Sequence, residues 1–118
     1  MPVRVYALDK SDVESEADVV EGTLSISGKL AKVLIDPGST HSFVRPKFMR
    51  GLGSTSEILP YLVEVSTPTG GQAIETDKIC RKCEVKIKDR IFPTDLISLP
   101  IHGYDVILGM DWLAQYCV

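Results

Sequence analysis

Short segments in which apolar and polar residues alternate occur along most of the chain, and this pattern is typical of β-strands with one face toward a core. The first segment runs from Val20 to Ile26, and a nearly continuous apolar segment follows at residues 30–35. Ser27-Gly28-Lys29 separates them and predicts a hairpin turn, because glycine adopts positive φ at little cost. The two segments are therefore expected to pair as a hairpin.

The rest of the chain continues this pattern, and only two short stretches favour helix. Strands are expected at residues 61–65, where Tyr61, Val63 and Val65 alternate, and then at residues 83–87, 91–99 and 104–108. Residues 45–52 predict a short helix with Pro46 in its first turn and Gly51 or Gly53 at its end, and residues 109–116 predict a second helix. Many short strands with no strand–helix alternation predict an all-β, barrel-like fold.

Composition narrows the possibilities further. Residues 1–18 are rich in Asp, Glu and Ser, so we expect a flexible lead-in before one folded domain at residues 19–118. The net charge of −3 gives no electrostatic reason to expect nucleic-acid binding. The apolar runs are far too short to span a bilayer, and no secretory signal opens the chain. Three cysteines, an odd number, argue against a secreted disulfide framework and favour a reduced intracellular setting.

Asp36 has an unusual place for an acidic residue, at the end of the apolar segment 30–35. A carboxylate near an apolar interior is costly unless it is paired or hydrogen-bonded. The backbone N–H of Gly38 and the side chains of Ser39 and Thr40 offer such hydrogen bonds. The local motif alone has a simpler interpretation, in which Asp36 caps its own β-turn, as Asp-Pro-Gly sequences often do.

Two separated segments resemble the retropepsin-like aspartic proteases. Residues 33–44, Val-Leu-Ile-Asp-Pro-Gly-Ser-Thr-His-Ser-Phe-Val, are similar to the active-site segment of that family, in which Asp-Ser/Thr-Gly follows an apolar strand. The Thr-His-Ser-Phe continuation is similar to the gypsy-type long-terminal-repeat retrotransposon branch. Residues 104–113, Tyr-Asp-Val-Ile-Leu-Gly-Met-Asp-Trp-Leu, resemble the second hallmark of that branch. The resemblance covers residues 20–117.

The resemblance implies a closed, barrel-like acid-protease domain with a flap hairpin, and an aspartic endopeptidase that needs no cofactor. Such enzymes use two carboxylates that share one proton. This chain has one Asp-x-Gly turn of the required kind, at Asp36, and none of the other aspartates of residues 19–118 is followed by one. These are Asp77, Asp89, Asp95, Asp105 and Asp111. The family therefore implies a homodimer with an Asp36/Asp36′ dyad. It also implies that this dimer cleaves a polyprotein, and that it does so in the cytoplasm or within virus-like particles.

The family also implies roles for the residues around Asp36. Pro37, Gly38 and Ser39 would support the active-site turn, and Thr40 and His41 would contact the substrate. Residues Thr67, Pro68, Thr69, Gly70 and Gly71 would form the flap that closes over the peptide. Ile107, Leu108 and Gly109 would pack beneath the turn, with Gly109 allowing close backbone approach.

Pro37 departs from the family pattern, which has Ser or Thr at this position. Proline has no hydroxyl and no N–H, so hydrogen bonds across the dimer axis would be missing. The alternative function is therefore a catalytically weak or inactive dimerisation or peptide-binding module. A third option is a zinc-binding adaptor built on Cys80 and Cys83. Zinc sites usually need four ligands, however, so we expect no metal and interpret these cysteines as packed or half-exposed strand residues.

Overall fold

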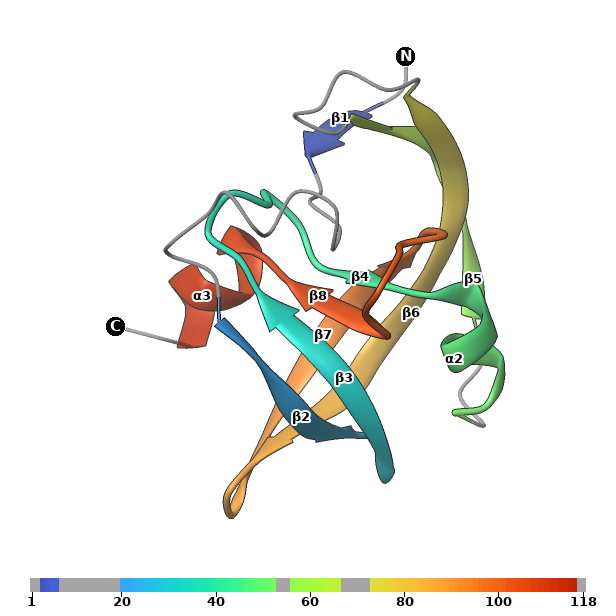
Figure 1. The fold of residues 1–118 in the computed structure, drawn as a ribbon. Coiled ribbons are helices and arrows are strands. Elements are labelled where there is room, and N and C mark those ends of the chain that lie inside the picture. The colour runs from blue at the N-terminus through green and yellow to red at the C-terminus, as the bar shows by residue number, and fades with distance from the viewer. Residues whose placement is uncertain (1–2, 7–19, 53–55, 67–72, 117–118) are drawn as a thin grey trace.

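The computed structural model describes residues 3–6, 20–52, 56–66 and 73–116, with side chains described from residue 20 onward. The described strands form one sheet in the order β1-β5-β6-β2-β3-β8-β4-β7. An additional pairing of β6 with β7 closes β6, β2, β3, β8, β4 and β7 into a six-stranded barrel (Figure 1). The elements are β1 Val3–Tyr6, β2 Val20–Ile26, β3 Lys29–Ile35, β4 Phe43–Val44, α2 Pro46–Arg50, β5 Ser56–Ser66, β6 Ile74–Ile87, β7 Arg90–Ser98, β8 Val106–Leu108 and α3 Met110–Tyr116.

The two hairpins of the barrel have turns with positive backbone φ angles. Ser27 (φ 49°) and Gly28 (φ 85°) connect β2 to β3, and the register runs without a break from Ile26↔Lys29 to Val20↔Ile35. Two central residues with positive φ fit the right-handed twist of a hairpin. In the β6–β7 hairpin, Lys88 (φ 55°) takes the corresponding position. The predicted β2–β3 hairpin is thus present in the structure.

A β-bulge in β6 determines where its cysteines lie. Cys80 pairs with Leu96 and Cys83 pairs with Thr94, so that two residues of β6 oppose Asp95 alone. The extra residue turns Cys83 to the same face of β6 as Cys80, and both side chains are fully buried. The two sulfurs form a disulfide. Both cysteines are thus packed, as one of the two environments expected from the sequence, and the bulge also brings these residues, three apart in sequence, side by side.

The core consists of two clusters of buried side chains, one on each face of the central strands. β8 contributes to both, because Val106 and Leu108 pack in the barrel cluster while Ile107 packs in the second cluster with Leu34. All three β8 residues are fully buried, which explains why this strand has a continuous apolar sequence instead of alternation. In the described parts of the chain, no helix is long and apolar enough to cross a membrane.

Two expectations differ from the structure. Val3–Tyr6 forms β1, which pairs in parallel with Val63–Ser66 of β5, although a flexible lead-in was expected over residues 1–18. Tyr61 is 47% exposed instead of sharing the buried face of Val63 and Val65, because the β5–β6 register shifts between Ile58 and Val63.

Candidate active site

Asp36 follows directly after β3 and is held there by the neighbouring parallel strand β8. Ile35 pairs with Leu108, and the Asp36 N–H donates to the Leu108 carbonyl at 2.9 Å. Asp36 is only 1% exposed. The Gly38 N–H donates to the Asp36 carboxylate Oδ1 at 2.8 Å, and the Ser39 N–H donates to the Asp36 carbonyl at 3.2 Å. These hydrogen bonds hold the buried Asp36 carboxylate within a tight turn.

A polar cluster behind this turn connects it to the start of α3. The Ser42 hydroxyl, which is fully buried, donates to Asp111 Oδ1 at 2.7 Å and accepts from the Gly109 N–H at 3.0 Å. The Asp111 carboxylate also accepts from the Ser42 N–H at 3.2 Å and from the Trp112 N–H at 2.7 Å. We call Ser42, Gly109 and Asp111 the clamp. It fixes the segment after the Asp36 turn to the helix that follows β8.

Gly109 lies where no side chain fits. A Cβ at this position would come well under 3.0 Å from the backbone carbonyl oxygens of Ser39 and His41. Backbone cannot move aside as a flexible side chain can, so glycine is required for this close approach. Ile107 and Leu108, which precede it, are fully buried beneath the turn.

The residues beside Asp36 present a polar surface outward. Pro37, Gly38 and Thr40 are exposed and His41 is half-buried, whereas Ser39 and Ser42 are fully buried. The Thr40 hydroxyl lies 3.0 Å from Nδ1 of the His41 imidazole. Residues 36–41 and 107–109, singled out in the sequence, are thus brought together. Residues Thr67–Gly71 lie outside the described part of the chain, although the strands that lead to them, β5 and β6, pair up to Val65↔Ile74.

Sequence reasoning assigned no role to Ser42, Asp111 or Tyr104. The Tyr104 hydroxyl donates to Glu21 Oε2 at 2.6 Å and connects the loop before β8 to β2. Burial, the hydrogen bond to Glu21 and the charge of Glu21 raise the pKa of Tyr104 to about 12. The only local signal for Asp111 was its place in the first turn of a predicted helix, where an acidic side chain is favourable.

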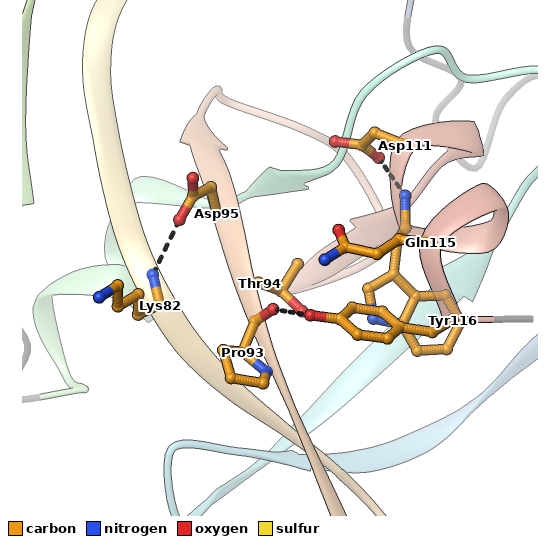
Figure 2. A pocket seen from close by; sticks show the side chains of 8 residues that line it. Lys82, Pro93, Thr94, Asp95, Asp111, Gln115 and Tyr116 are labelled. Carbon is orange, nitrogen blue, oxygen red and sulfur yellow. Dashed lines mark hydrogen bonds between the residues drawn. The ribbon is translucent and has the colours of Figure 1, made fainter.

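Figure 2 shows a pocket of about 320 Å³ between α3 and the paired strands β6 and β7. The Tyr116 hydroxyl donates to the Pro93 carbonyl at 2.6 Å on one side, and the Lys82 N–H donates to Asp95 Oδ1 at 2.9 Å on the other. The lining includes Asp111 but no residue of the Asp36–His41 turn. This pocket is therefore not the surface from which a substrate would reach Asp36.

The described residues contain no group of three or more His, Cys, Asp or Glu side chains placed to hold a metal ion. Cys80 and Cys83, the ligands of the zinc hypothesis, are bonded to each other instead. The group that the structure does place at the turn is the buried carboxylate of Asp36, with the Gly38 N–H donating to it.

Comparisons with known proteins agree with this geometry. The sequence model of a family described as "Retroviral aspartyl protease" matches residues 1–118. Among solved structures, the chain is similar to the EIAV protease complexed with the inhibitor HBY-793, with a TM-score of 0.65 and 20% identity, covering 84% of this chain and 88% of that one. A comparison with curated protein sequences gives no match. The structural likeness confirms the expected fold class, a closed barrel of strands with two short helices.

Proposed function

Since the chain belongs to the retroviral aspartyl protease family, we propose that it is one subunit of a homodimeric aspartic endopeptidase with Asp36 as its catalytic residue. The observation that carries the proposal is the environment of Asp36. Its carboxylate is almost fully buried at the end of a core strand, with Gly38 donating to Oδ1 from an exposed turn.

A second copy of the chain supplies the second carboxylate. Five other aspartates lie in the described residues 20–52, 56–66 and 73–116, and three of them have structural partners; the five are Asp77, Asp89, Asp95, Asp105 and Asp111. Asp95 binds Lys82 and Arg81, Asp105 binds Arg45 and Lys32, and Asp111 belongs to the clamp. A two-fold axis beside the exposed Pro37–Gly38 turn would bring the two Asp36 side chains together.

The paired carboxylates would share one proton, since two like charges at such a distance do not both ionise. The ionised carboxylate accepts a proton from a water molecule, whose oxygen attacks the carbonyl carbon of the scissile peptide bond. The protonated carboxyl donates a hydrogen bond to the carbonyl oxygen as negative charge develops there. The carboxyl that took the proton from water then donates it to the peptide nitrogen, and the C–N bond breaks to release the amine and the new carboxyl terminus.

The substrate would lie between the two catalytic turns and the β5–β6 hairpin. Residues Thr67–Gly71, which connect these strands, would close over the bound peptide.

We further propose a polyprotein of a gypsy-type retrotransposon as the substrate, supported by the Thr40-His41-Ser42-Phe43 continuation of the active-site segment.

One observation favours the alternative of a weak or inactive module. Pro37 is exposed in the turn that would face the partner subunit, and it offers neither a hydroxyl nor an N–H. Without these groups the two turns would have fewer hydrogen bonds across the axis. A dimer of this kind would assemble only at high local concentration, as within a polyprotein.

The deciding experiment is cleavage of a peptide library by concentrated protein across acid and neutral pH, followed by mass spectrometry. Asp36→Asn should abolish cleavage because the amide cannot accept the proton from water. Asp89→Asn is the matched control, since Asp89 is exposed in the β6–β7 turn. Equal cleavage by wild type and Asp36→Asn, or none by wild type at concentrations where it is dimeric, would refute the proposed enzyme and leave the binding module.

A further inference from the structure

The bulge in β6 lies where this strand changes one of its neighbours. On one side, β6 pairs with β5 as far as Ser56↔Cys80, and further along Val85 and Lys86 pair with β2 instead. On its other side, β6 pairs with β7 both before and after the bulge. The bulge is therefore the junction between the hairpin formed by β5 with the first half of β6 and the barrel (Figure 1).

Polar contacts at this junction connect β5, β6 and β7. The Arg81 guanidinium contacts Glu57 of β5, with Nε 2.5 Å from Oε2, and Asp95 of β7, with Nη1 3.3 Å from Oδ2. The Lys82 N–H donates to Asp95 Oδ1 at 2.9 Å (Figure 2). The charged side chains are about half exposed, so water and salt screen their ion pairs. These pairs alone do not hold the hairpin firmly against the barrel.

The Cys80–Cys83 disulfide lies beneath these contacts, in the barrel cluster. Only two residues separate the cysteines, so the bond restricts the unfolded chain little and acts mainly on local structure. It keeps the two ends of the bulge together around Lys82, whose φ of 54° is unfavourable for a residue with a side chain. Two thiols need more space than one disulfide, and the fully buried neighbours Val85 and Leu96 leave little room for them.

We propose that the Cys80–Cys83 disulfide is a redox switch, reduced by a dithiol, that controls how firmly the β5–β6 hairpin is held against the barrel. In the oxidised form the bulge is closed and the hairpin is held. In the reduced form the bulge relaxes and the hairpin separates more readily, while the barrel stays folded. The switch goes beyond the proposed function, because it does not depend on cleavage activity.

The redox step exchanges one disulfide for another. A thiolate of the dithiol attacks one cysteine sulfur, the S–S bond breaks, and the other cysteine leaves as a thiolate that takes up a proton. The second thiol of the reductant, also as its thiolate, then displaces the first cysteine, which is protonated in turn. Two electrons pass from the dithiol to the protein. The dithiol becomes a cyclic disulfide, and the protein has two thiols in place of its bond.

The reductant reaches the sulfurs through the junction itself. Both sulfurs are covered, but Arg81 and Lys82 between them are exposed, and the pairing with β5 ends at Ser56↔Cys80. Local separation of the hairpin at this end uncovers the bond while the other barrel strands stay paired. Opening therefore favours reduction, and reduction favours opening, because both act on the same bulge.

The test compares the two redox forms of the whole chain. Cys117→Ser removes the third cysteine, and the protein is equilibrated in mixtures of reduced and oxidised dithiothreitol. Alkylation and mass spectrometry should count a change from no free thiol to two, with the circular dichroism of the folded protein unchanged. Hydrogen exchange of backbone amides in β5 and residues 74–80 should then be at least about tenfold faster in the reduced form. Exchange in β3 and β8 should stay within about twofold.

Two controls show that the bond is responsible. The double variant Cys80→Ala/Cys83→Ala should give the same exchange rates with reduced and with oxidised dithiothreitol. Reoxidation of the reduced protein should restore slow exchange in the hairpin, and this control needs no substitution at the junction.

Three results would each overturn the switch. Two free thiols in oxidised dithiothreitol would mean that the bond does not form. A bond that is reduced only when the whole protein unfolds would be purely structural. Equal exchange in both forms, or faster exchange that extends equally to β3 and β8, would mean that the bond does not control the hairpin. Cleavage by wild type and Asp36→Asn tests the proposed function separately, so each proposal can fail while the other stands.

Discussion

Replacing Ser42 with alanine tests whether the clamp holds the Asp36 turn. The Ser42 hydroxyl makes two hydrogen bonds, and alanine removes both while the Ser42 N–H can still donate to Asp111. The Gly109 N–H is then left buried without its acceptor, which costs about 1–3 kcal/mol. The bond to the Asp111 carboxylate contributes less, because Asp111 is exposed and water can replace the hydroxyl. We therefore expect a loss of about 2–4 kcal/mol in the free energy of unfolding.

Urea denaturation at a fixed protein concentration measures this loss, with the concentration held constant because dimerisation contributes to apparent stability. Ser56→Ala, at the exposed start of β5, is the matched control and should change stability by less than about 0.5 kcal/mol. Cleavage activity should fall in Ser42→Ala even under conditions where the variant remains folded. A loss no larger than that of the control would show that the clamp does not determine the position of the turn.

Three further changes test other parts of the structure. Pro37→Ser should strengthen dimerisation by about 1–3 kcal/mol, measured by sedimentation velocity over a dilution series; a tight wild-type dimer that the change leaves unaltered would contradict this. Gly109→Ala should lower the free energy of unfolding by more than about 2 kcal/mol in the same denaturation assay and should abolish cleavage. Gly22→Ala is the control, because its Cβ would meet nothing within 4 Å, and it should lower the free energy of unfolding by less than about 1 kcal/mol. The stability contributed by the raised pKa of Tyr104 is fully present below its ordinary pKa of 10.0 and is lost as pH rises toward about 12, because the unfolded chain releases the phenol proton first. Tyr104→Phe should remove this part of the alkaline loss in denaturation curves, and the exposed Tyr61→Phe should not.

The parts of the fold that sequence could predict are those fixed by neighbouring residues. Ser27-Gly28 specified the β2–β3 turn because positive φ angles are a local property. The alternation of Cys83, Val85 and Ile87 specified which face of β6 lies inward. Pro46 marked the first turn of α2, which ends at Arg50 with Gly51 as its C-cap.

Features that depend on distant strands were not predictable in this way. The inward position of Cys80 requires the bulge opposite Asp95, which arises from the pairing of β6 with β7. Val3–Tyr6 has no strong periodicity of its own and forms a strand through its partners at Val63–Ser66. The partial exposure of Tyr61 follows from a register shift that its own sequence does not reveal.

The candidate site shows the same division. Asp36 and its neighbours could be identified because they are contiguous and resemble a known motif. The bond between Ser42 and Asp111 joins residues 69 positions apart and becomes visible only when β3 and β8 lie side by side. The flap at Thr67–Gly71 stays a prediction.

β6 extends over fourteen residues and takes part in pairings with β5, β2 and β7 (Figure 1). Its first half pairs with β5 in the hairpin beside the barrel, and its second half closes the barrel itself. An insertion or deletion within Ile74–Ile87 would therefore change both the reach of that hairpin and the register of the barrel. In related chains we expect the length of this strand to be fixed. Length variation should instead accumulate at the Lys88–Asp89 turn, where added residues would change neither the reach of the β5–β6 hairpin nor the register of the barrel.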